Sequence, residues 1–498
     1  MYCGLLFCCL RKIICVLHRI LFAAPHRRQL PYMLPYKLWN WKSSVPSVIN
    51  GSWRLLKMID RIDMIIDLPP LFPEPKPKWT DECCTYRVPQ RLRQVKEEAY
   101  TPKLISIGPF HHDKEELRDM EALKLRYYIE FCQRTGTEPR DIASIIEKKE
   151  QKIINCYDGS LDMRNENILQ IILVYSIFII EYFARDTAGG ENENNNMGQW
   201  SKTVRNPWLK AHIMLDLILL ENQIPFFILH KLYKKIFRRN CEDSFFKLAC
   251  EYFRKYLFSQ EKQKLPEKEA KHFTDLIRYI YYPSNPITGD PVSYVHSSTK
   301  LYETGVRFEK IEEGRFDKIK FKKWEPLGKC QCFSWLLIFL PCLKCFPCLE
   351  PMQSILYLPS FVADNRSEYL FRNIMALEQL YYPSEAYLCN YMVLLDHLIN
   401  TSEDVELLVE KGIIVNALGS YQEVANMVNK IALEIVEENS CYNDVAKNLR
   451  NHYQNGCNRN IGYLKSTYFS NLWRGTATVV GFIILGFTLW DFVRSSTK

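Results

Sequence analysis

Residues 216–233 read DLILLENQIPFFILHKLY, an apolar run that three consecutive polar residues interrupt. These are Glu221, Asn222 and Gln223, and Pro225 follows two residues later. A buried polar group without a hydrogen-bond partner costs about 1–3 kcal/mol, so the triplet needs partners. Proline disfavours the helical conformation of the residue before it. The stretch therefore predicts a helix that ends near Gln223, a tight corner, and a second helix from about Pro225.

This polar corner has a structural and a functional interpretation. In the structural one, Glu221, Asn222 and Gln223 bond the N–H and C=O groups that both helix ends leave without partners. In the functional one, Glu221 acts as an acid or base. No histidine or second carboxylate adjoins it in the sequence, which favours the structural interpretation.

Charge is unevenly distributed along the chain. Its 498 residues are 47% hydrophobic and 24% charged, which is typical of a globular protein of one or two domains. The net charge is +8, but residues 1–59 hold nine Lys and Arg and no acidic residue, which leaves about −1 for the remainder. We therefore expect no nucleic-acid-binding core. Residues 1–82 are interpreted as a basic targeting or membrane-surface arm that ends in a stiff, proline-rich spacer.

Two cysteine-rich apolar segments have several interpretations. Residues 1–24 fit an interfacial helix with acylated cysteines, an organelle transit peptide, a signal-anchor or a mispredicted extension. Residues 325–352 carry five of the 18 cysteines around a short apolar run. Structural zinc sites use paired CxxC knuckles in polar turns, so a membrane-dipping, acylatable loop or a retained non-coding insertion is favoured there.

Residues 83–465 have the pattern of a large helical domain. Residues 168–183, ILQIILVYSIFIIEYF, are interrupted by polar residues, which predicts a buried core helix at about 164–184 rather than a membrane span. Period-two alternation near residues 306–308, 319–321 and 355–358 predicts a small β-ribbon. The expected fold class is mainly α, with one large helical domain, a small β-ribbon and a C-terminal transmembrane helix.

The last apolar stretch, residues 473–493, is predicted to be that single transmembrane helix, with a short tail at 494–498. Its apolar run extends from Ala477 to Trp490, and Phe492 and Val493 lie just beyond Asp491. Sixteen residues span about 24 Å of a ~30 Å hydrocarbon core, and flanking arginines extend the span. A span so near the end suggests tail anchoring in the plasma membrane or an endomembrane, while the flanking charges leave the orientation open.

The sequence lacks the short motifs of common catalytic sites. It has no P-loop, G-x-G-x-x-G, G-x-S-x-G or H-E-x-x-H. The nearest candidate is the pair His111 and His112, but adjacent histidines point to different sides of a regular element and rarely bind one metal. We therefore predict no catalytic, cofactor-binding or metal-binding residue, and no cofactor.

Several blocks of the sequence resemble the plant domain-of-unknown-function 247 family, also called UPF0481-type proteins. The blocks are LLENQIPFFIL at residues 219–229, YRVPQRLRQVKEEAYTPKLISIGPFHHDKEELRDMEALKLRYY at 86–128, NIMALEQLYYP at 373–383, DHLINTSEDVELLVEKGIIVNALGSYQEVANMVN at 396–429 and the apolar C-terminus. The resemblance implies a mostly helical plant protein with a C-terminal membrane segment. It implies no known chemistry, although some members are associated with recognition between pollen and stigma. Tyr175 and Ser176 replace an Asp–Gly pair usual in the family.

Two classes of function follow from these observations. The first is a membrane-anchored protein-interaction or recognition module, whose partners are the lipid bilayer and an unidentified protein. The alternative is an enzyme of unknown class, with a site at the corner of Glu221, Asn222 and Gln223 or in the loop of His111 and His112.

Overall fold

The computed structural model describes residues 82–158, 168–187, 206–237, 244–257, 270–281, 287–311, 316–323, 354–456 and 472–496. The expectations for the arm at residues 1–81 and for the insert at 325–352 lie outside these ranges. Within them the chain is mainly helical, which confirms the predicted class in its coarse form.

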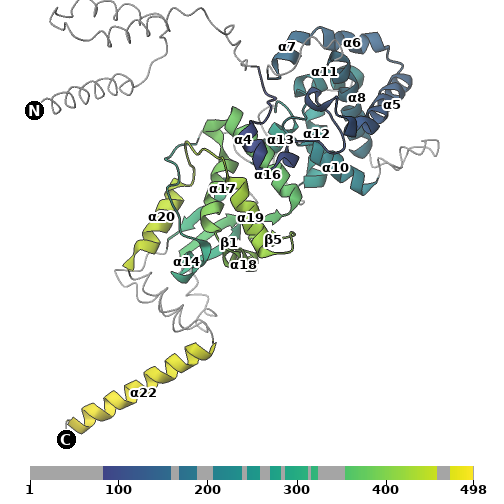
Figure 1. Cartoon of the computed structure of the whole chain (residues 1–498). Coiled ribbons are helices and arrows are strands. Elements are labelled where there is room, and N and C mark those ends of the chain that lie inside the picture. Colours follow the sequence, from purple (N-terminus) through teal and green to yellow (C-terminus); the bar gives the residue numbers. More distant parts are fainter. Residues whose placement is uncertain are drawn as a thin grey trace, which may run out of the picture. The chain divides into compact units, whose positions relative to one another are not determined.

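Four of the helices from the first part of the chain pack against one buried helix, α8. The bounds are α4 Gln90–Val95, α5 Arg118–Thr135, α6 Pro139–Glu147, α7 Glu150–Asn155, α8 Ile168–Thr187, α10 Pro207–Leu217, α11 Phe226–Phe237 and α12 Phe245–Leu257. α8 contacts α5, α6, α11 and α12, and Figure 1 shows these five together. Its successive residues Ile177, Phe178, Ile179 and Ile180 are fully buried, so α8 is a core helix, although it is long and apolar enough to cross a membrane.

Helices from the second part continue the same hydrophobic core. The bounds are α13 Phe273–Tyr281, α14 Ser298–Glu303, α16 Asn365–Tyr381, α17 Tyr387–Leu398, α18 Ser402–Glu410, α19 Tyr421–Ala432 and α20 Asn443–Gln454. One continuous cluster of buried side chains includes Phe178 on α8, Leu276 on α13, Ile374 on α16 and Val424 on α19. Helices of both parts therefore contribute to one core, and a smaller separate cluster contains Val88, Tyr100 and Leu377.

The strands of the described ranges form two small sheets rather than the predicted ribbon. β1 (Val306–Ile311) is parallel to β3 (Ser354–Pro359), and β2 (Lys320–Lys322) is antiparallel on the other side of β3. Parallel pairing needs a long crossover, which the chain between β1 and β3 supplies. The sequence pattern also missed a second sheet, in which β4 (Phe361–Ala363) pairs in parallel with β5 (Ile414–Asn416).

The last described element, α22, is longer than the segment predicted from the sequence. It extends over Leu472–Ser496 and has 25 residues. The part Trp473–Ser495 is long and apolar enough to cross a membrane, and no residue in its most apolar 18-residue stretch is buried. Ala477, Trp490 and Val493 all lie within it.

Candidate functional site

The predicted polar corner is the turn between α10 and α11. α10 ends at Leu217 and α11 begins at Phe226, so the first helix stops six residues before its predicted end near Gln223. The physical reason is that the amide groups of Asn222 and Gln223 bond the last carbonyl groups of α10. Side-chain donors thus replace the backbone donors of a further helical turn.

Asn222 joins this turn to the segment that precedes the two histidines. Its Nδ2 donates to the carbonyl oxygens of Asp216 at 2.9 Å and Ile105 at 3.0 Å. Its Oδ1 accepts from the N–H groups of Ile107 at 2.7 Å and Gly108 at 3.1 Å. The amide therefore uses two donors and two acceptor positions while the side chain is fully buried.

Gln223 bonds the ends of two helices. Its Nε2 donates to the carbonyl oxygens of Leu217 at 2.8 Å and Leu219 at 2.6 Å, near the end of α10. Its Oε1 accepts from the N–H of Phe273 at 2.9 Å, where α13 begins. Backbone atoms of Gln223 also lie against Gly108, where a Cβ would come within 2.8 Å of the Gln223 nitrogen.

Asp216, on the last turn of α10, performs a similar task that sequence reasoning missed. Its carboxylate accepts from the N–H groups of Lys103 at 3.1 Å, Leu104 at 2.7 Å and Ile105 at 2.8 Å. Burial raises its pKa to about 6, against the effect of these three bonds. The one sequence signal was a carboxylate at the start of an apolar run.

Glu221 is the only charged member of the triplet, and it is fully buried. One oxygen accepts from the N–H of Val88 at 2.6 Å and from the guanidinium of Arg93, and the other contacts His111 Nε2 at 3.1 Å. Burial acts to raise the pKa of Glu221, but the bonds from His111, Arg93 and Val88 lower it overall. Burial lowers the pKa of His111. The structure thus brings together two candidates that lie 110 residues apart.

His112 points away from this group toward α8. Its Nδ1 lies 2.7 Å from the hydroxyl of Tyr175, which donates to Glu121 Oε2 at 2.7 Å. Lys124 lies over the ring of Tyr175, 3.4 Å from its centroid, and donates to the Ser106 carbonyl at 2.5 Å. Burial lowers the pKa of Lys124 to about 8. Tyr175, the departure from the family pattern, therefore connects α5, α8 and the histidine loop.

Burial limits the chemistry that this group can perform. Glu221 is 0% exposed and His111 is 5% exposed, and both oxygens of Glu221 have protein partners. A general base must reach the proton that it abstracts, and a substrate has no access to these atoms. Among the described residues, no group of three or more His, Cys, Asp or Glu side chains is placed to hold a metal ion. Glu221 and His111 therefore form hydrogen-bonded joints between segments, whereas the His112 side chain is 29% exposed and its part in the enzyme alternative stays a prediction.

An open cavity lies directly beside the corner. It has a volume of about 380 Å³, and Pro225, Phe226 and Phe227 line it together with Cys84 and Cys156. The corner helps to build it, because the N–H of Phe226 donates to the Lys271 carbonyl at 2.7 Å. Cys84 and Cys156 meet because the Cys84 N–H donates to the Cys156 carbonyl at 2.9 Å.

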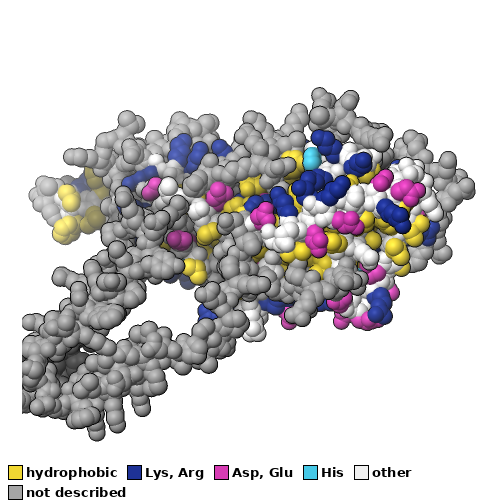
Figure 2. All heavy atoms as spheres, turned by 90° about the horizontal axis from the view of Figure 1, so that it is seen from above, with side chains coloured by type: hydrophobic (Ala, Val, Ile, Leu, Met, Phe, Trp, Pro, Cys, Tyr) yellow, Lys and Arg dark blue, Asp and Glu magenta, His cyan; other side chains and the backbone are white. Residues whose placement is uncertain are grey.

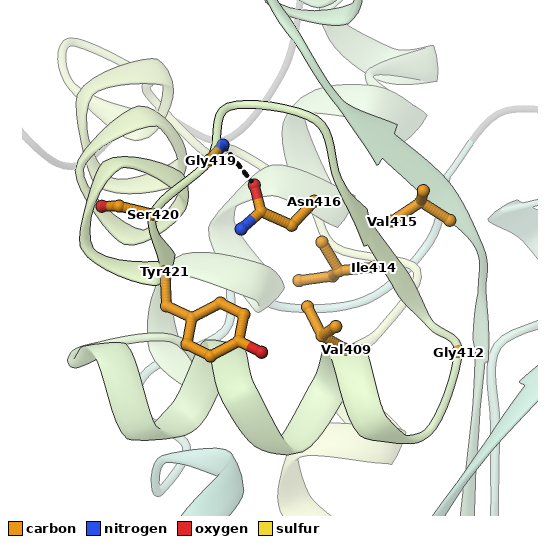
Figure 3. A pocket seen from close by; sticks show the side chains of 8 residues that line it. All are labelled: Val409, Gly412, Ile414, Val415, Asn416, Gly419, Ser420 and Tyr421. Atoms are coloured by element: carbon orange, nitrogen blue, oxygen red, sulfur yellow. Dashed lines mark hydrogen bonds between the residues drawn. The ribbon is translucent and has the colours of Figure 1, made fainter.

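A second hollow lies at the edge of β5. Figure 3 shows Val409, Ile414 and Tyr421 around it, and the Asn416 side chain accepting from the N–H of Gly419 at 3.1 Å. Val415, which also lines the hollow, is 49% exposed, and its partner Val362 on β4 is 41% exposed. In Figure 2, basic and acidic side chains alternate over the described part of one face without a large patch of one sign.

Comparison with known proteins places these features in a family. Residues 85–487 match the family DUF247, described as "Plant protein of unknown function". The chain is 27% identical to UPF0481 protein At3g47200 of Arabidopsis thaliana, over 81% of this chain and 84% of that protein. It is 21% identical to Putative UPF0481 protein At3g02645 of the same plant, over 80% of this chain and 88% of that protein. No solved structure matches the chain. The corner, the histidine loop and α22 up to residue 487 all lie inside the matched range, and the chain belongs to the DUF247 family of plant proteins.

Proposed function

We propose that this protein is anchored in a membrane by α22 and that its helical body is a protein-interaction module. The observation that carries the proposal is the exposed apolar surface of α22. Ten of its apolar side chains are more than half exposed: Trp473, Val480, Ile483, Ile484, Leu485, Phe487, Leu489, Trp490, Phe492 and Val493. So much apolar surface on one helix is unfavourable in water and favourable in lipid.

The geometry of α22 supports a span rather than an amphipathic surface helix. Ile483, Ile484 and Leu485 are consecutive, so they point to different sides of the helix and leave no polar face there. The 25 residues of α22 extend over about 37 Å, more than the ~30 Å hydrocarbon core. Trp473 and Trp490 lie near its two ends, where aromatic residues are enriched in membrane helices.

Carbonate extraction of membranes tests the anchor. The full chain and a chain that ends at residue 471 are expressed in plant cells, and the membrane fractions are washed with alkaline carbonate. We expect the full chain in the pellet and the shortened chain in the supernatant. Release of the full chain would contradict anchoring by α22. Retention of the shortened chain would place the anchor elsewhere.

The edge of β5 supports the interaction role. Among the described strands β5 pairs only with β4, so its other edge presents backbone groups beside exposed Val415. Extended segments of partner proteins add to such edges as an extra strand, with apolar side chains on one face. The occupant that we propose is therefore an extended, β-branched segment of a partner protein.

Cross-linking in membranes tests this surface. Proteins cross-linked to the full chain are quantified for the wild type, for Val415→Glu and for the control Gln422→Glu, which alters an exposed residue of α19. We expect at least one partner to be lost with Val415→Glu and retained with the control. An unchanged set of partners would contradict the role of this edge.

A further inference from the structure

The cavity beside the corner has the dimensions and lining of a small-molecule site. Its volume of about 380 Å³ lies within the range of about 300–1,000 Å³ that is usual for ligand pockets. Four aromatic rings line it, from Phe226 and Phe227 on α11 and from Phe245 and Phe246 on α12. The rings of Phe226 and Phe245 meet edge to face, with centroids 5.7 Å apart. This wall fits a flat apolar body.

Basic side chains gather at the same place. Lys152 and Lys271 line the cavity, and Lys152 Nζ lies 4.8 Å from the ring centroid of Phe227. Lys231 follows the lining residue His230 on α11, and burial together with the charges of Lys149 and Lys152 lowers the pKa of Lys231. Like charges that act on one another in this way are unfavourable unless an anion compensates them.

Carboxylates of the protein compensate little of this charge. Within the described ranges, Lys149, Lys152 and Lys231 form no ion pair with Asp or Glu. Glu82 is the one acidic side chain among the described residues that line the cavity, and its Oε2 accepts from Asn155 Nδ2 at 2.9 Å. An apolar pocket next to three crowded lysines is therefore complementary to a ligand with an apolar body and a negative charge.

We infer that this cavity binds a small organic anion with a flat apolar body, the anionic group near Lys152 and the body against the phenylalanine rings. Cys84 and Cys156 are also among the residues that line the cavity, and each is 3% exposed. A bound ligand would cover them, which supplies a local marker of occupancy. This site is distinct from the membrane anchor and from the β5 edge, so its test is independent of the proposed function.

The experiment compares 2-naphthoate with 2-naphthamide, which has the same ring system and nearly the same shape but no charge. Binding to the full chain in detergent micelles is measured by equilibrium dialysis against empty micelles. We expect 2-naphthoate to bind and 2-naphthamide to bind at least fivefold more weakly. Lys152→Gln is expected to weaken the binding of 2-naphthoate about fivefold, because the loss of one partly exposed ion pair has an effect of this size. The matched control, Lys430→Gln, removes an exposed lysine of α19 and is expected to leave binding unchanged.

Protection of individual thiols from modification tests where the ligand binds. Methyl methanethiosulfonate converts a thiol to a methyl disulfide with release of methanesulfinate, and this modification is followed at each cysteine by mass spectrometry, with and without saturating 2-naphthoate. We expect slower modification of Cys84 and Cys156 and an unchanged rate at Cys132, which lies on α5 outside the cavity lining. Equal affinity for the two probes, no effect of Lys152→Gln, absence of binding at millimolar 2-naphthoate, or equal modification rates would each overturn the inference.

Discussion

Gly108 lies so close to the backbone of Gln223 that a Cβ on Gly108 would come within 2.8 Å of the Gln223 nitrogen and 2.9 Å of its carbonyl oxygen. The backbone of Gly108 has φ −119° and ψ 164°, an extended conformation that any residue adopts. Glycine is therefore required at this position for close packing, not for conformational freedom. The contact fixes the histidine loop against the polar corner.

Gly108→Ala is expected to lower the free energy of unfolding by about 1–3 kcal/mol, the usual cost of an overpacked contact, because backbone atoms have to move. Urea denaturation measures the change. Gly456→Ala is the control, since a Cβ there meets no atom within 4 Å. Equal stabilities of the two variants would show that the corner is loosely packed.

Asn222→Ala is expected to destabilise the fold by about 2–4 kcal/mol, because it leaves the buried N–H groups of Ile107 and Gly108 and two carbonyl groups without their partners. The control Gln422→Ala removes an amide that bonds Asn426 on the exposed surface of α19. The stabilities of the two variants are compared by thermal unfolding. A loss no larger than that of the control would argue that water enters the corner.

Arg278 is another buried group, and it joins α13 to the end of α16 and the turn that follows. Its Nε lies 3.6 Å from Glu378 Oε1, and its Nη2 donates to the Glu385 carbonyl at 2.8 Å. Arg278→Met leaves Glu378 buried without this charge and is expected to cost about 3–5 kcal/mol. Arg366→Met, which removes an exposed ion pair with Asp364, is expected to cost less than about 1 kcal/mol. Similar unfolding midpoints for the two variants would contradict this account.

His272 is expected to make the body less stable as the pH drops below about 6.5, whereas Asp216, with its pKa raised to about 6, acts in the opposite direction. Burial lowers the pKa of His272 to about 3, and its Nε2 donates to the Cys84 carbonyl at 2.9 Å. Between pH 6.5 and 3 the unfolded chain therefore binds a proton at this residue that the folded chain does not. From pH 7 to 5.5 this lowers the free energy of unfolding by about 1 kcal/mol. His272→Gln should make the pH dependence shallower by that amount, and an unchanged slope would argue against a buried neutral histidine.

Leu485→Arg is expected to weaken retention of the chain in carbonate-washed membranes, because a charge at the centre of a span costs about 2.5–3.5 kcal/mol. Ser495→Arg, near the end of the same helix, is the control and is expected to leave retention unchanged. Equal retention of both variants would show that α22 does not cross the hydrocarbon core.

Sequence patterns predicted the helices and strands that depend on residues close together in the chain. The apolar character of residues 168–183 and its polar interruptions identified α8 as a core helix, and Pro225 marked the start of α11. Alternation located β1, β2 and β3 but carried no information on their parallel or antiparallel pairing. β4 and β5 have three residues each, too few for a periodic signal.

The partners of the corner could not be predicted from the sequence. Glu221 bonds Val88 across 133 positions and Asn222 bonds Ile107 across 115, and no local pattern encodes contacts of that range. The end of α10 was misplaced for the same reason, because it depends on amide groups that turn back onto the helix. The cavity with its lysines combines residues from α7, α11 and α12 with the segment before α13, and only the fold brings them together.

Photo-cross-linking from α22 tests the central claim, membrane anchoring by this helix, most directly. A benzophenone amino acid replaces Phe487 on α22 or, as a control, exposed Tyr421 on the helical body. Irradiated membranes are then analysed for lipid adducts on the full chain. We predict acyl-chain adducts at position 487 and none at position 421. Adducts at position 487 to protein alone would contradict a span and would make α22 a helix that binds another protein surface.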